Sequence, residues 1–207
     1  LSLRRQRQMC IRDRYKASNQ AGRQHGYIRV SELSDRKKYR RVLKAVDAGE
    51  LVKVRHGVYA PPEEMLNNII DVESIVPGGV VCLYNAWAYY GLTTISPPEF
   101  CIAISAKRKV SLRTPFPIKL FYWKDDNLKF GISEVKVSNY HVHMTDLERS
   151  VCDAVKYRNK IGSALCSEII RNYTKRKDRN LSRLSEYAKK LRVEKTIKEY
   201  MTIALGE

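Results

Sequence analysis

Residues 35–60 constrain the fold more than any other part of the chain, because they join a two-sided helix pattern to a hairpin pattern. Apolar residues recur there at the spacing of one helical face, at Tyr39, Val42, Leu43 and Val46. Basic residues repeat the same spacing two positions earlier, at Lys37, Arg40, Arg41 and Lys44. Two positions are about 200° of helical rotation. The pattern therefore predicts a helix with an apolar face toward a core and a cationic face toward solvent.

A short hairpin is predicted directly after this helix. Ser31 and Asp35 mark two successive helix starts, and Gly49 ends the second helix. Residues 51–54 and 58–60 are rich in β-branched residues, and Gly57 between them can adopt the positive φ of a tight turn. A basic helix followed by a small hairpin with a basic tip is typical of a winged helix-turn-helix. The expected DNA contacts are Arg36, Lys37, Arg40, Arg41, Lys44, Arg55 and His56.

The positive charge of the chain is concentrated in separate stretches. The 207 residues include 39 Lys and Arg against 22 Asp and Glu, a formal net charge of +17. Residues 15–60 contribute +7 and residues 146–207 contribute +6, whereas residues 61–145 are neutral. A charge of this size favours a polyanionic partner, and nucleic acid is the commonest one. We therefore expect two cationic surfaces.

The first 14 residues, LSLRRQRQMCIRDR, are set apart from the rest. They carry +4, show no apolar periodicity and lack the apolar stretch or amphipathic helix of a targeting peptide. They resemble the in-frame translation of a sequencing adapter. We interpret residues 1–14 as a non-native leader, and we expect a DNA-binding domain over residues 15–62 and an α+β domain over residues 63–207.

The second domain is predicted to mix strands and helices. Strands are expected over residues 80–83, 100–104, 118–123 and 134–137. Helices are expected over residues 64–75, 85–90, 161–173, 181–191 and 193–204. Thr145 and Glu148 have the spacing of a capping box, which opens a further helix. The predicted fold class is α+β: a winged helix-turn-helix, then a mixed α/β domain that ends in a helical bundle.

Four polar residues of this domain resemble part of a nuclease site. Asp125, Asp126, Glu134 and Lys136 follow the D…E-x-K arrangement, in which acidic groups hold a divalent metal and a lysine steadies the phosphate. Glu134 and Lys136 would share one face of a strand. A charged pair on a solvent-facing strand is the commoner explanation for such a pattern.

Other candidate sites are weaker. His141 and His143 would share a strand face and could bind a metal with Asp146 or Glu148, yet two histidines without an evident third ligand are usually structural. Ser150 and Cys152 lie in a predicted helix without a nucleophile motif. No glycine-rich phosphate loop is present. We therefore predict no catalytic residue, no metal and no cofactor, and a protein that is not an enzyme.

A second basic run joins two of the predicted C-terminal helices. It contains Lys175, Arg176, Lys177 and Arg179. Three explanations of this run stay open: a solvated loop, a second contact with the DNA backbone, or a docking surface for an acidic partner.

The lengths of the apolar runs and the spacing of the cysteines argue against several classes of protein. No apolar run approaches the ~18 residues that span a bilayer, so no membrane association is expected. The five cysteines are scattered and never spaced as C-x-x-C, which argues against a disulfide framework and against a zinc ribbon.

Several sequence blocks together resemble one protein family. Residues 26–33, 48–54 and 57–59 are similar to the N-terminal domain of AbiEi-type antitoxins of type IV toxin–antitoxin systems. Blocks of that family's second domain are similar to residues 83–93 (LYNAWAYYGLT), 145–153 (TDLERSVCD), 157–162 and 184–193. One block alone has little specificity, but their order and spacing agree over most of residues 20–205.

The resemblance implies a bacterial, cytoplasmic antitoxin of abortive infection, a form of phage defence. Its N-terminal domain would bind the double-stranded DNA of its own promoter and repress its operon. Its second domain would counteract a nucleotidyltransferase-like toxin, with or without direct contact. Two alternatives stay open: a metal-dependent nuclease with a winged-helix headpiece, and a winged-helix regulator without a toxin whose second domain senses a ligand or dimerises.

Overall fold

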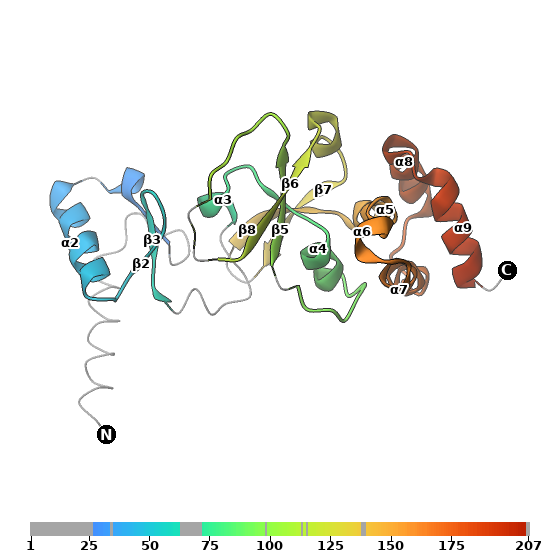
Figure 1. The fold of residues 1–207 in the computed structure, drawn as a ribbon, viewed down its shortest axis with the longest axis horizontal. Coiled ribbons are helices and arrows are strands. Elements are labelled where there is room, and N and C mark those ends of the chain that lie inside the picture. The colour runs from blue at the N-terminus through green and yellow to red at the C-terminus, as the bar shows by residue number, and fades with distance from the viewer. Residues whose placement is uncertain are drawn as a thin grey trace, which may run out of the picture. The chain divides into compact units, whose positions relative to one another are not determined.

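The computed structural model describes residues 27–33, 35–62, 72–97, 99–112, 114, 116–137 and 140–205. Residues 1–14, which we interpret as a leader, lie outside these residues, as does most of the helix predicted over residues 64–75. The chain forms two compact units, Leu1–Ile75 with Leu112–Pro115, and Val76–Ser111 with Phe116–Glu207. The predicted domain boundary after residue 62 stays a prediction. Both units combine helices and strands, which are labelled in Figure 1.

The first unit contains a three-stranded antiparallel sheet and one long helix. In chain order its described elements are β1 (Ile28–Arg29), the 3-10 turn η1 (Val30–Glu32), α2 (Arg36–Asp47), β2 (Val52–Arg55), β3 (Val58–Ala60) and α3 (Val72–Ile75). The sheet order is β1-β3-β2. The predicted helix and hairpin are confirmed, whereas the first of the two predicted helix starts opens only the single turn η1. The pairing of β1 with β3 was not predicted.

Local chemistry sets the ends of α2 and of the hairpin. The Asp35 carboxylate accepts a hydrogen bond of 3.0 Å from the Lys37 amide, so Asp35 caps the helix. After α2 the backbone at Gly49 adopts a φ of 72°. Gly57 has a φ of 75° in the turn between β2 and β3, as the hairpin pattern predicts.

A small apolar core holds α2 against the sheet. Its buried members are Ile28, Val42, Ala45, Leu51 and Tyr59. The expected apolar face of α2 is partly wrong, because Leu43 is 37% exposed and Ala45 is buried in its place. Leu43 lies about 100° around the helix from Val42, at the border between the buried and the solvent-facing sides.

The second unit contains a five-stranded mixed sheet followed by helices. Its described elements in chain order are β4 (Val80–Val81), α4 (Tyr84–Tyr89), β5 (Phe100–Ser105), β6 (Ile118–Trp123), the 3-10 helix η3 (Asp125–Leu128), β7 (Ile132–Val137), β8 (Tyr140–Thr145), α5 (Leu147–Lys156), α6 (Arg158–Ile161), α7 (Ser163–Thr174), α8 (Leu181–Leu191) and α9 (Glu194–Leu205). The sheet order is β6-β5-β4-β8-β7, with β4 parallel to β8 and β5 parallel to β6. The predicted strands and C-terminal helices are thus confirmed within a few residues.

Helix α5 is the centre of the second unit, with α7 and α8 packed against it (Figure 1). Every residue from Leu147 to Val155 is buried. The predicted capping box at its start is wrong: Thr145 still pairs with Ile132 in the sheet, and Asp146 caps the helix by accepting a 2.8 Å hydrogen bond from the Arg149 amide. The helix therefore begins one residue later than expected.

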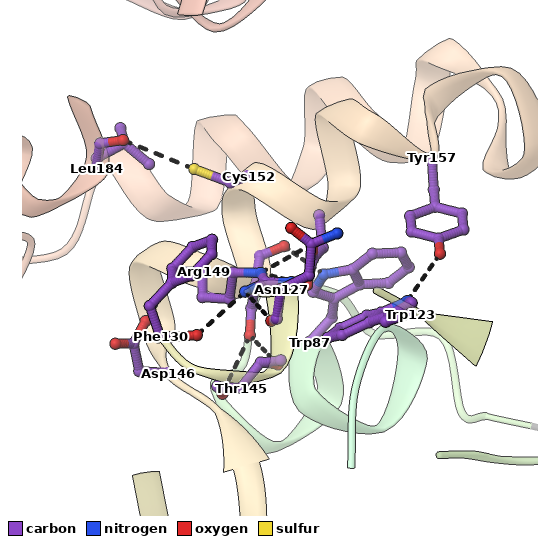
Figure 2. A network of polar contacts seen from close by, with 12 residues as sticks. Trp87, Trp123, Asn127, Phe130, Thr145, Asp146, Arg149, Cys152, Tyr157 and Leu184 are labelled. Carbon is purple, nitrogen blue, oxygen red and sulfur yellow. Dashed lines mark hydrogen bonds and ion pairs between the residues drawn. The ribbon is translucent and has the colours of Figure 1, made fainter. Parts of the chain in front are cut away.

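Arg149 is a buried cation that joins the sheet side of the second unit to α5. Its guanidinium lies 4.6 Å from the ring centre of Trp123 and 4.5 Å from that of Phe130. Nε is 3.1 Å from both carboxylate oxygens of Asp153, and Nη1 donates to the carbonyl oxygens of Asn127 and Phe130. Figure 2 shows Arg149 together with Trp123, Asn127 and Phe130. Removing either charge would leave the other buried without its counter-ion.

Four cysteines are buried in this unit as free thiols: Cys82, Cys101, Cys152 and Cys166. Burial raises the pKa of each thiol above its ordinary value, to about 11 for Cys101. They contribute to the core as small apolar side chains.

Gly131 offers a stability test of this core. Its φ is 64°, and a Cβ placed there would lie 2.7 Å from the Arg149 Cβ. We expect Gly131→Ala to lower the free energy of unfolding by about 2–4 kcal/mol, from left-handed backbone strain together with the clash. Urea denaturation followed by tryptophan fluorescence measures it, because Trp87 and Trp123 are both buried in the second unit.

The matched control is Gly91→Ala. Gly91 has the same φ of 64° with nothing within 4 Å of the added carbon. Gly91→Ala should therefore lower the free energy of unfolding only by the cost of the backbone strain, about 1 kcal/mol. Equal losses in the two variants would show that Arg149 yields to the extra methyl group.

Candidate nucleic-acid interface

The solvent side of α2 carries the predicted basic residues. All five are exposed: Arg36, Lys37, Arg40, Arg41 and Lys44. At 100° per residue they lie between about 120° and 260° from the buried Val42, so they form one face opposite the core. We call these five residues the basic face of α2. Sequence periodicity therefore predicted the orientation of the face as well as the helix.

The exposed Asp47 lies in the same sector of the helix, but no carboxylate among the described residues forms an ion pair with the basic face. Within the described part of the chain, none of the five side chains makes a hydrogen bond or an ion pair. The Asp35 carboxylate is engaged by the Lys37 amide in the helix cap. Five adjacent cations without counter-ions repel one another, and a polyanion placed against them relieves that repulsion.

The hairpin that follows α2 carries additional polar groups. His56 is exposed in the turn, and Arg55 is the last residue of β2. Lys53, which was not among the predicted DNA contacts, is exposed on β2 next to the fully buried Val54. The alternation of polar and apolar residues along a strand would have identified it.

Leu43 also belongs to the exposed surface beside the basic face. Its 37% exposure leaves a branched apolar side chain next to Arg40, three residues earlier on the helix. An apolar group at such a position can contact the methyl group of thymine in a major groove. The apolar pattern assigned Leu43 to the core and so concealed this property.

The second predicted basic run forms the loop between α7 and α8, and two of its four cations are engaged. Arg176 donates to both carboxylate oxygens of Asp178, at 2.9 and 2.7 Å, and to the Tyr90 carbonyl oxygen at 2.6 Å. Arg179 donates to the carbonyl oxygens of Thr174 and Arg176. Lys175 and Lys177 are exposed and make no polar contact with any residue that the structure describes. The two arginines thus hold the loop in shape.

The three carboxylates that resemble part of a nuclease site have separate partners. Asp125 accepts from Ser105 and pairs with Lys107 at 2.6 Å, and Asp126 pairs with Lys129 at 2.9 Å. Glu134 lies on β7 and pairs with His141 at 3.2 Å. No group of three His, Cys, Asp or Glu side chains among the described residues could hold a metal ion.

Lys136 shares the exposed side of β7 with Glu134, as predicted, and His141 and His143 share the facing side of β8. Within the sheet, Lys136 is opposite His141 and Glu134 is opposite His143. The four side chains form a mixed-charge exposed strand surface.

The remaining candidates are buried in the core. Ser150 exchanges a 2.9 Å hydrogen bond with Thr145, and the Cys152 thiol donates to the Leu184 carbonyl oxygen (Figure 2). Glu148, predicted as part of the capping box, accepts from the Asn180 amide at 2.9 Å instead. These contacts are those of packed structural residues.

A match to one protein family agrees with the family resemblance of the N-terminal residues. No curated protein matches the chain. None of the described helices is both long and apolar enough to cross a membrane. The segment that carries the basic face and the hairpin is recognised by a family model: residues 21–62 match the AbiEi antitoxin family of transcriptional regulators.

Proposed function

We propose that the first unit is a winged helix-turn-helix that binds double-stranded DNA through the basic face of α2 and the tip of the hairpin. The observation that carries the proposal is the group of five exposed cations on one helix face, none of which forms an ion pair with a residue that the structure describes. An α-helix fits the major groove, where arginine can donate two hydrogen bonds to guanine. The adjoining hairpin would supply Lys53, Arg55 and His56 for contacts with the flanking DNA backbone.

The order of elements supports this reading of the unit. A strand, a short helical turn, a longer helix and an antiparallel hairpin follow one another, and the first strand pairs with the last, β1 with β3. In helix-turn-helix proteins the second helix is the one that enters the groove. We infer that α2 has this role; among the described residues, the three-residue 3-10 turn η1 precedes it.

The protein would act as a bacterial, cytoplasmic, non-enzymatic repressor of its own operon and as an antitoxin. The family description supports both the regulatory and the antitoxin role. The second unit would counteract a nucleotidyltransferase-like toxin. A toxic nucleotidyltransferase-like reading frame next to this gene, harmless when the two are co-expressed, would support that role; toxicity that persists on co-expression would contradict it.

The DNA-binding proposal predicts a steep dependence on salt. Each phosphate neutralised lowers log K by about 0.9 per unit of log salt, so five contacts predict a slope between about −4 and −5. Raising NaCl from about 100 to about 300 mM would then weaken promoter binding roughly 100-fold. Fluorescence anisotropy with labelled upstream DNA measures the slope.

A scrambled duplex of the same length is the control, since it should share most of the slope but bind more weakly. A slope shallower than about −1 would contradict phosphate binding by the basic face. The same samples supplied with Mg²⁺ or Mn²⁺ test for cleavage, and cleavage that disappears in Glu134→Ala would favour the nuclease.

A further inference from the structure

The second unit contains a pocket that the proposed function does not use. It lies between α4, β5, β6 and α7, which are labelled in Figure 1, and its volume is about 590 Å³. Sites for small molecules commonly have volumes of about 300–1,000 Å³ and mostly apolar walls. The rings of Tyr84 and Phe121 and the side chains of Ile161 and Leu165 provide such walls.

The strand register places part of the lining. Lys119 and Phe121 are alternate residues of β6 and share one face, and Lys119 is paired with Cys101 on the neighbouring β5. Burial raises the pKa of Cys101 to about 11, so this thiol is neutral near pH 7 and adds no charge to the floor. Ile95, which is 43% exposed, borders the pocket with an apolar side chain.

The polar groups of the pocket leave one carboxylate without a cation. Glu99 and Lys119 pair with each other at 3.6 Å, so their formal charges sum to zero. Glu168, on α7, accepts only a 3.4 Å hydrogen bond from the Thr94 amide, and no basic side chain of the described residues pairs with it. The pocket therefore has a net negative charge, although residues 146–207 carry +6.

We propose that this pocket binds a small organic cation with an apolar body. The ammonium or guanidinium group would pair with the Glu168 carboxylate. The body would lie against Tyr84 and Phe121, whose ring faces attract cations and apolar groups alike. An anionic ligand of the same shape would meet the uncompensated carboxylate and be rejected.

Three probes of nearly equal shape test the charge requirement. They are 3-phenylpropylamine, which is cationic at pH 7, neutral 3-phenylpropan-1-ol and anionic 3-phenylpropanoate. Isothermal titration calorimetry with the full chain should show the amine binding at least about tenfold more tightly than the alcohol, and no binding of the carboxylate. Equal affinities for all three, or no binding of the amine at about 10 mM, would overturn the proposal.

Two variants locate the site. Glu168→Gln keeps the shape and an acceptor for Thr94, so it should lower the affinity for the amine to that for the alcohol and leave alcohol binding intact. Ala164→Trp, at an exposed position of α7 that lines the pocket, should abolish binding of both. Unchanged amine binding in Glu168→Gln, or equal losses of amine and alcohol, would contradict the assigned role of the carboxylate.

The matched control is Glu186→Gln, on α8. Glu186 is exposed and pairs with Lys190 at 2.7 Å. It is not among the residues that line the pocket, so this variant should bind the amine as the unaltered chain does. Promoter binding should be unchanged in Glu168→Gln, which separates failure of this proposal from failure of the DNA-binding one.

Discussion

Replacing Arg40, Arg41 and Lys44 together by alanine is expected to weaken promoter binding by at least about 100-fold at physiological salt. An arginine or lysine that contacts DNA contributes about 1–3 kcal/mol, and tenfold in affinity corresponds to about 1.4 kcal/mol. All three side chains are exposed. The same substitutions should therefore shift the free energy of unfolding by no more than about 0.5 kcal/mol each. Anisotropy with upstream DNA and urea denaturation measure the two quantities.

The control for this variant removes the same charges elsewhere. Arg171, Lys189 and Lys195 are exposed on α7, α8 and α9. Their joint replacement by alanine lowers the net charge of the chain by the same amount, and we expect less than about a tenfold loss in affinity from it. Equal losses in the two triple variants would mean that binding depends on total charge and not on the basic face of α2.

The salt dependence gives a second measure from the same proteins. If three phosphate contacts are lost, the slope of log K against log salt should become shallower by about 2.7. A weaker affinity with an unchanged slope would instead indicate that the three residues contact bases.

Arg149→Met is expected to lower the free energy of unfolding by about 3–5 kcal/mol at pH 8, because it leaves the Asp153 carboxyl buried without its counter-ion, where it must either stay charged or take up a proton. Methionine keeps most of the apolar volume between Trp123 and Phe130, so loss of packing adds little. Tryptophan fluorescence during urea denaturation reports the change, since both tryptophans are buried in this unit. A loss below about 1 kcal/mol would show that the ion pair contributes little.

The effect of this substitution should depend on pH. Burial raises the pKa of Asp153 to about 6, even though Arg149 lowers it. A carboxyl whose pKa is higher folded than unfolded favours the folded state most at low pH, and that advantage declines as pH rises from about 4 through about 6. Without Arg149 this pKa rises further, so the variant should lose less stability at pH 5 than at pH 8.

The double variant Arg149→Met with Asp153→Leu is the matched control. It removes both charges and leaves no orphaned ion, so it should recover at least half of the stability lost by Arg149→Met. A loss equal to the sum of the two single variants would mean that the two residues act independently.

The sequence predicts the parts of this protein that depend on local spacing. The helix from Arg36 to Asp47 and its two faces follow from a 3.6-residue period, and the turn at Gly57 follows from the need for a positive φ. The error at Leu43 and Ala45 has a local cause too. Periodicity finds the centre of an apolar face, but neighbouring elements decide how far its edges are covered.

Local spacing does not predict which segments, distant in the sequence, pack together. Arg149 and Asp153, four residues apart on α5, have the spacing of an ordinary surface ion pair. Both are buried, and the rings of Trp123 and Phe130 from the sheet side lie against the Arg149 guanidinium. The pocket at Glu168 likewise needs residues from β5 and β6, and the partners of Arg176 include the distant Tyr90.

The four buried thiols of the second unit have a consequence for its chemistry under oxidising conditions. Oxidants and electrophiles attack the thiolate, and each of these cysteines is buried with a raised pKa, so it remains a protonated thiol near neutral pH. In the folded second unit these four cysteines should therefore stay unmodified thiols whether a cell is reducing or under oxidative stress. Only unfolding would expose these cysteines to modification.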